Sequence, residues 1–206
     1  MARIVDRDAK RQKILEAASA CFAREGYDST SMEAVAAAAG ISKGSLYDYF
    51  KNKEDLFFGV FEWFQQLIMV SAMERMGDYK DARERIIAFA DASIGALLEH
   101  LALYPVSLEV WAAAAKPATR DRFSDAMKNL YASYRAELAG LIREAQAEGA
   151  IRQDIDVEAT AGMLIGAVDN LALHYWLDRS FDPQAWCRAF LGSLFDGIGT
   201  DTRKAQ

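Results

Sequence analysis

The chain has 206 residues, of which 52% are hydrophobic and 26% charged, and a formal net charge of −6 at pH 7. This length allows one modest domain plus one larger core. No apolar stretch approaches the roughly 18 residues that span a membrane, and the start lacks an apolar signal core, so we expect a cytoplasmic protein without a membrane partner.

The charge is unevenly distributed, which matters because a net negative chain taken alone argues against nucleic-acid binding. Residues 1–53 contain nine Lys or Arg against seven Asp or Glu, whereas residues 54–206 contain fifteen against twenty-three. The positive charge therefore lies at the amino end. Five basic residues fall in the first thirteen positions: Arg3, Arg7, Lys10, Arg11 and Lys13. They predict either a flexible arm that contacts phosphates or a minor groove, or a solvated terminus.

Three short helices are predicted at this end, over residues 8–25, 31–39 and 43–50. Thr30 with Glu33 has the spacing of a capping box at the start of the second helix. Gly40 favours the left-handed conformation that ends a helix, and Ser42 is a natural N-cap for the third. Two helices joined by so short a turn are typical of a helix-turn-helix.

In the third predicted helix, Leu46 and Phe50 are four residues apart and share the inward face. The small, polar and basic residues around them are left toward solvent or a ligand, as in a helix that enters a major groove. Gly40 to Gly44 also matches the G-x-S-x-G pattern of a hydrolase. That pattern needs a buried strand before the serine, whereas Met32 to Ala39 has a helical period, so we do not expect an enzyme.

The run TSMEAVAAAAGISKGSLYDYFKNKEDLF, from Thr30 to Phe57, together with Phe22 to Tyr27, resembles the N-terminal domain of TetR/AcrR-type transcriptional regulators. The resemblance covers the first 57 residues, and Asp48 departs from it because many relatives carry a non-acidic residue there. The predicted DNA-binding residues are Thr30, Ser31, Ser42, Lys43, Gly44, Ser45, Tyr47, Asp48, Tyr49 and Lys53. The hydroxyls of Thr30, Ser31 and Ser42 and the two lysines are expected to hold phosphates, while Ser45, Tyr47 and Asp48 reach base edges. The resemblance also implies the alternative that Tyr47 and Tyr49 meet the phosphate backbone.

Six further helices are predicted over residues 54–76, 81–103, 105–115, 118–148, 157–178 and 183–197, and no segment alternates as a strand does. The fold class is therefore all-α: an N-terminal three-helix helix-turn-helix DNA-binding domain, residues 1–53, plus a C-terminal helical bundle, residues 54–206, for ligand binding and dimerisation. The helix that starts near Lys53 belongs to both parts.

Aromatic residues are concentrated in the C-terminal bundle, where 18 of the chain's 23 lie after position 54. Some of them suit a mostly apolar small-molecule site with a few polar anchors, although each also suits a plain core. The candidate ligand-binding residues are Phe89, Ser93, Leu97, Trp111, Met127, Tyr131, Tyr134, Met163, Asn170 and His174. Cys21 and Cys187 are isolated and expected to be buried, and the two histidines predict no metal site and no cofactor.

The segment from Ala159 to Leu177 is apolar almost all round, so such a helix cannot face water. A second copy of the chain is expected to cover it, with help from the last helix. The predicted dimer-interface residues are Leu164, Val168, Leu171, Tyr175, Trp186, Phe190 and Leu194. TetR-like proteins pair through their last two long helices, which agrees with this expectation.

Together these features predict a ligand-responsive transcriptional regulator, acting as a repressor. A homodimer would bind a palindromic double-stranded DNA operator and be released by a small, mostly apolar or aromatic effector. The alternative is an all-helical sensor or adaptor that does not bind DNA.

Overall fold

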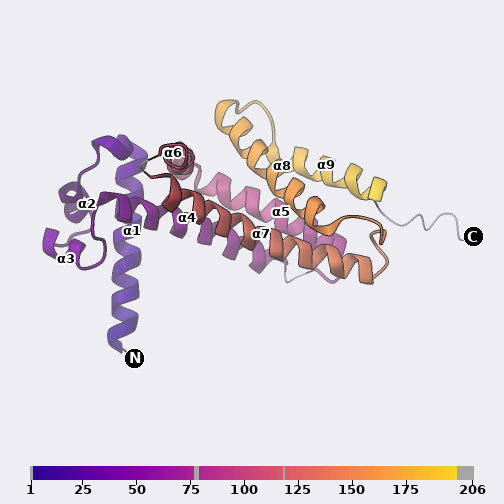
Figure 1. Ribbon diagram of the computed structural model, residues 1–206, viewed down its shortest axis with the longest axis horizontal. Coiled ribbons are helices and arrows are strands. Elements are labelled where there is room, and N and C mark those ends of the chain that lie inside the picture. Colours follow the sequence, from indigo (N-terminus) through magenta and orange to yellow (C-terminus); the bar gives the residue numbers. More distant parts are fainter. Residues whose placement is uncertain (1, 77–78, 118, 199–206) are drawn as a thin grey trace, which may run out of the picture. The chain divides into compact units, whose positions relative to one another are not determined.

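The computed structural model describes residues 2–76, 79–117 and 119–198, and every regular element among them is a helix (Figure 1). The predicted all-α class is confirmed. The elements are α1 (Ala2–Ser29), α2 (Met32–Ala38), α3 (Lys43–Tyr47), α4 (Lys53–Met76), α5 (Ala82–Glu99), the 3₁₀ helix η1 (Leu101–Leu103), α6 (Tyr104–Ala114), α7 (Arg120–Ala147), α8 (Val157–Leu177) and α9 (Pro183–Ile198).

The chain forms two compact units that are each discontinuous in sequence. The first consists of Met1–Leu67 and His100–Phe123, and the second of Ile68–Glu99 and Ser124–Gln206. The first unit thus continues past residue 53 and takes in η1, α6 and the first residues of α7. Both α4 and α7 begin in the first unit and continue into the second.

Both ends of α1 differ from the sequence expectation. The helix begins at Ala2 rather than residue 8, and Gly26 interrupts it with φ 77° and ψ 166°. The Thr30 hydroxyl is buried and donates to the Gly26 carbonyl at 2.8 Å. The predicted capping box at Thr30 is therefore wrong: Ser31 caps α2, because its side chain accepts the Ala34 N–H at 3.1 Å.

The turn between α2 and α3 is confirmed. Gly40 has φ 68°, its N–H donates to Ala37 at 3.1 Å, and the N–H of Ile41 donates to Ala36 at 3.0 Å. These two bonds satisfy carbonyls that the end of α2 would leave without partners. Ser42 caps α3 by accepting the Ser45 N–H at 3.1 Å. The third helix ends at Tyr47, three residues earlier than predicted.

Aromatic rings fill the core of the first unit. Phe57 of α4 lies edge-on to Phe22 of α1 with 5.3 Å between ring centroids, and 4.7 Å from Tyr27. Gly59, also on α4, has no room for a side chain, because an added Cβ would lie 2.8 Å from Phe50 and 3.3 Å from Leu15. The first half of α4 is therefore packed tightly against α1 and the residues after α3.

The second unit has its own apolar core, drawn from α5, α7, α8 and α9 and the end of α4. Ile86, Ile142, Leu191 and Phe195 are among its almost fully buried residues. On α5, Asp91 ties this helix to α9: it forms an ion pair with Arg188 and accepts from Gln184 Nε2 at 3.1 Å.

Other helix ends follow the predictions with small shifts. Asp156 caps α8 by accepting the Ala159 N–H, and Asp182 accepts from the two N–H groups that open α9. The helix predicted over 81–103 instead ends at Glu99, and α6 begins at Tyr104 with Pro105 in its first turn. Residue 118, the predicted start of the next helix, lies outside the described residues.

The expectation that no apolar stretch is long enough to span a membrane needs correction. By length and composition alone, Lys53–Glu74 in α4 is apolar enough to cross a membrane. However, 44% of that stretch is buried inside the protein. The core helix of a soluble protein passes the same test, and the rings of Phe57 and Phe64 pack within the first unit.

Candidate functional site

The outer surface of α3 carries the residues predicted to meet a ligand. Leu46 is completely buried and Phe50 is almost so, as predicted for the inward face. The exposed residues are Ser42, Lys43, Gly44, Tyr47 and Asp48, whereas Ser45 and Tyr49 are half-buried. An added Cβ at Gly44 would meet no atom within 4 Å, so backbone here is open to close approach from outside.

Two hydroxyls at helix starts serve as caps and remain exposed. Ser31 and Ser42 each accept a backbone N–H, which leaves their O–H protons able to donate outward. Lys43 forms an ion pair with Glu33 of α2, and this carboxylate raises the pKa of Lys43 while the pKa of Glu33 is lowered. The ammonium also lies 5.9 Å from the Tyr47 ring centroid. Both side chains are exposed, so an anion can compete for Lys43.

Lys53, which the sequence predicts to hold a phosphate, makes its contacts within the protein. Its ammonium donates to the carbonyls of Tyr27 at 2.9 Å and Asp28 at 3.0 Å, and lies 4.5 Å from the Tyr27 ring centroid. These carbonyls lie beyond the interruption at Gly26. Lys53 therefore holds the end of α1 against the start of α4.

Two cations of α1 lie beside Tyr49, and the sequence indicated their positive charge but not this contact. The guanidinium of Arg7 lies 5.8 Å and the ammonium of Lys10 lies 6.0 Å from the Tyr49 ring centroid. Both cations belong to α1, which replaces the flexible arm that the sequence suggested; the side chain of Arg3 lies outside the described residues. The charge run signalled these cations, but only folding brings them to Tyr49.

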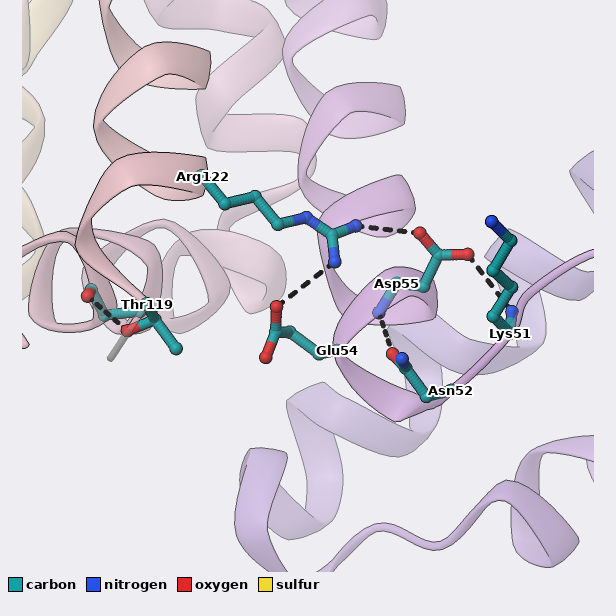
Figure 2. A network of polar contacts seen from close by, with 7 residues as sticks. Lys51, Asn52, Glu54, Asp55, Thr119 and Arg122 are labelled. Atoms are coloured by element: carbon teal, nitrogen blue, oxygen red, sulfur yellow. Dashed lines mark hydrogen bonds and ion pairs between the residues drawn. The ribbon is translucent and has the colours of Figure 1, made fainter. Parts of the chain in front are cut away.

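The start of α4 is joined to the start of α7 by a forked ion pair (Figure 2). Arg122 donates to Glu54 at 3.1 Å and to Asp55 at 2.8 Å, and its guanidinium lies 4.9 Å from the Phe58 ring centroid. Asp55 in turn accepts the Lys51 N–H at 3.1 Å. All of these residues belong to the first unit, and sequence reasoning missed Arg122 because its partners are more than sixty positions away.

The ten candidate ligand-binding residues fall into different environments. Phe89, Ser93 and Tyr134 are buried, and Leu97, Met127 and Tyr131 are half-buried; Trp111, Met163, Asn170 and His174 are exposed. Trp111 belongs to the first unit and the other nine to the second. Within the second unit, the Tyr134 ring lies edge-on to Phe89 at 6.5 Å, which joins α7 to α5.

The predicted dimer residues are also divided. Leu164 is buried, and Val168, Leu171 and Leu194 pack partly buried against the core, so these four face the interior of the second unit. Tyr175 is half-buried with its ring 5.8 Å from Phe181. Trp186 and Phe190 are 54% and 47% exposed. On α8, the exposed residues after the first turn are Met163, Gly166, Asp169, Asn170, His174 and Leu177.

Comparison with known families decides what this arrangement is. Residues 14–60 match the model described as bacterial regulatory proteins, tetR family, and residues 82–197 match the C-terminal model of BetI-type transcriptional repressors. The chain belongs to the TetR family. The protein is thus a transcriptional regulator whose helix-turn-helix, α2 and α3, binds DNA, and the alternative of an adaptor without DNA binding is set aside.

Several relatives match this chain over nearly its whole length. The fatty acid metabolism regulator protein of Bacillus subtilis is 25% identical over 92% of this chain and 95% of its own. The repressor KstR2 of Rhodococcus jostii is 28% identical, covering 94% and 93%. The solved structure of FadR from Bacillus subtilis in complex with stearoyl-CoA superimposes with a TM-score of 0.76 at 24% identity, covering 91% and 98%. These relatives are regulators rather than enzymes.

Proposed function

We propose that the protein is a ligand-responsive repressor in the cytoplasm, without enzymatic activity, which binds a palindromic operator as a homodimer. The observation that carries this proposal is the exposure of the polar side of α3 while Leu46 anchors its other side in the core. A short helix presented in this way can enter a major groove. Residues 1–53 supply the reading head, and residues 54–206 supply the effector site and the dimer contacts.

Phosphate contacts are proposed for the groups at the rim of α3. Ser31 and Ser42 keep hydroxyl protons free to donate, and Lys43 exchanges Glu33 for a phosphate. Tyr49 with Arg7 and Lys10 extends this rim along α1. Such contacts fix the register of a protein on the duplex without reading its sequence.

Base contacts are proposed for the middle of α3. Gly44 allows close approach of the backbone, and Ser45 and Tyr47 reach base edges or thymine methyl groups. Asp48 is exposed at the end of α3 and can accept from a cytosine amino group. Thr30 and Lys53 are left out of this interface, because their polar groups are bonded within the protein.

The dimer is proposed to form across the outward faces of α8 and α9. Met163 and Leu177 on α8 are 75% and 74% exposed in the single chain, and Trp186 and Phe190 on α9 add two large rings. Apolar groups exposed to this extent on neighbouring helices mark an interaction surface. A two-fold pair then places two α3 helices in half-sites about 34–36 Å apart.

The effector is proposed to bind in the second unit, among α5, α7 and α8, near Phe89, Ser93, Tyr131 and Tyr134. Its body is mostly apolar, in line with the aromatic residues among these helices and with relatives named for fatty acid metabolism and stearoyl-CoA binding. A ligand moves an equilibrium from 1:99 to 99:1 if it binds one state about 5.5 kcal/mol more tightly. Operator release follows when the bound state spaces the two reading heads wrongly for the half-sites.

The test is fluorescence anisotropy of the full chain with labelled DNA from the region flanking its own gene. We expect saturable binding that weakens as salt is raised, because phosphate contacts release counterions. Tyr47→Ala should reduce operator affinity, whereas Tyr79→Ala, a similarly exposed tyrosine in the second unit, should not. If pooled genomic fragments show no salt-sensitive association with the protein, the proposal is refuted.

A further inference from the structure

Glu33 of α2 and Lys43 of α3 form an ion pair across the turn of the helix-turn-helix. The ammonium of Lys43 donates to the Glu33 carboxylate, and the side chains of Lys43 and Glu33 are 54% and 59% exposed. Ser31 and Ser42 cap the helix starts from which the two side chains project, so both are held on ordered backbone. Lys43 is thus paired in the free protein, at a place where a phosphate can reach it.

Lys43 is the only cation of the helix-turn-helix segment, residues 31–50. The same segment contains two carboxylates, Glu33 and Asp48, so its net charge is −1. Asp48 is exposed at the end of α3, where its charge opposes phosphates. As long as Glu33 holds Lys43, the segment presents no uncompensated positive charge to a duplex.

Positive charge next to this segment comes from α1. Arg7 and Lys10 lie beside the Tyr49 ring, so they can attract a duplex while Lys43 is still paired. For Lys43 to join them on the phosphates, its bond to Glu33 must break, and the carboxylate left behind then repels those phosphates. Glu33 raises the pKa of Lys43, so the ammonium stays charged and the competition is between two anions.

We infer that Glu33 is an intramolecular competitor of the DNA phosphate at Lys43 and lowers the affinity of the reading head for duplex DNA. The inference rests on the proposed function and adds to it the regulation of affinity at the same site. Because the competition concerns phosphates, it weakens binding to every sequence. A lower intrinsic affinity also reduces the differential affinity that an effector needs in order to release the operator.

The test is a fluorescence anisotropy titration of the full chain with two labelled duplexes of equal length, one from the region flanking its own gene and one of shuffled sequence. We expect Glu33→Gln to bind both at least about threefold more tightly than the wild type at low salt, since the ammonium is free and one negative charge near the phosphates is gone. The difference should shrink as salt is raised, because exposed charges are screened. Circular dichroism melting checks that the variant folds.

A double-mutant cycle with Lys43→Ala separates competition for the lysine from plain repulsion of the duplex. If Glu33 acts by occupying Lys43, Glu33→Gln must tighten binding more in the wild-type background than in the Lys43→Ala background. Repulsion of phosphates by Glu33 needs no lysine and gives a gain at least as large in the Lys43→Ala background. That result overturns the inference. Weaker binding of Glu33→Gln also overturns it, because Glu33 would then position Lys43 for the phosphate.

Glu137→Gln is the matched control. It makes the same change in net charge at an exposed site on α7 in the second unit, so DNA affinity should stay unchanged, and an equal gain there contradicts a local role of Glu33. A gain of Glu33→Gln confined to the flanking duplex would make Glu33 a base-contacting residue, which also contradicts the inference. If the wild type binds DNA and the cycle fails, only the role of Glu33 falls. A wild type that binds no DNA refutes the proposed function itself.

Discussion

Gly26 and Gly140 have different backbone conformations, so replacing each of them by alanine should have opposite effects on stability. Gly26 has φ 77° and ψ 166°, a conformation that is essentially restricted to glycine, whereas Gly140 lies inside α7. At neither position would an added Cβ meet an atom within 4 Å, so packing does not decide the outcome. Backbone conformation alone sets the effect of a methyl group.

We therefore expect Gly26→Ala to lower the free energy of unfolding by about 1–3 kcal/mol, because alanine must be forced into that backbone conformation. Gly140→Ala should raise it by about 0.5–1 kcal/mol, since glycine is the poorer helix former. Urea unfolding of both variants measures the pair. Changes of the same sign would contradict this account.

Lys53 illustrates contacts that sequence alone does not foresee. Its position at the head of a helix beside a DNA reader suggested a phosphate contact, but its ammonium is bonded to carbonyls of Tyr27 and Asp28. Nothing local in the sequence indicates this, because the partners lie 25 and 26 residues earlier. Lys43, by contrast, lies where the local pattern placed it, on the exposed side of α3.

The two lysines should consequently respond differently to replacement by alanine. Lys43→Ala should reduce the slope of log Kd against log salt by about one unit. Lys53→Ala should leave the slope nearly unchanged and instead cost about 1–2 kcal/mol of stability, since a charged donor to two carbonyls is lost. Anisotropy titrations at several salt concentrations and thermal melts distinguish the cases. A unit loss of slope in Lys53→Ala would return this residue to the DNA interface.

Elements were predictable where local chemistry sets their ends. Gly40 and Ser42 define the turn between α2 and α3, as predicted. The last two helices begin at residues 157 and 183, as predicted, and Asp156 and Asp182 cap them. The orientation of α8 was harder, because a helix that is apolar nearly all round has no polar stripe to show which side faces the core. Leu164 lies inside and Met163 lies outside, and only the packing of the folded chain distinguishes these neighbouring apolar residues.

The link between α4 and α7 yields a prediction at the scale of elements. Arg122 holds Glu54 and Asp55, and Asp55 accepts the Lys51 N–H, so the fork stabilises the first turn of α4 (Figure 2). Arg122→Ala should speed hydrogen exchange in residues 51–58 severalfold, while the melting temperature falls little because exposed ion pairs contribute only about 0–1 kcal/mol.

Arg122→Lys provides the matched variant. A lysine keeps the charge but cannot reach both carboxylates with a planar fork, so exchange should lie between that of the wild type and Arg122→Ala. Mass spectrometry of the peptide covering residues 51–58 gives the readout. Identical exchange in all three proteins would mean that the fork does not stabilise this turn.

The whole molecule carries an exposed apolar face on α8 and α9, and this face is the basis for the proposed pairing. Met163→Glu should weaken the dimer by about 100-fold or more, because a buried methionine contributes roughly 1.5–3 kcal/mol and two copies are changed at once. Met73→Glu is the control, since Met73 of α4 is also exposed, at 43%, but lies off this face. Analytical ultracentrifugation at micromolar concentration measures both, and a wild-type monomer would refute the pairing.

Because the reading head and the α8 and α9 face are formed by different residues, damage to one leaves the other intact. A copy with a disabled α3 would still pair with normal copies and trap them in one-headed complexes that occupy only a single half-site. In a cell that expresses both versions, such an allele should be genetically dominant. An allele that loses Trp186 and Phe190 should be recessive, because its product never joins a normal partner.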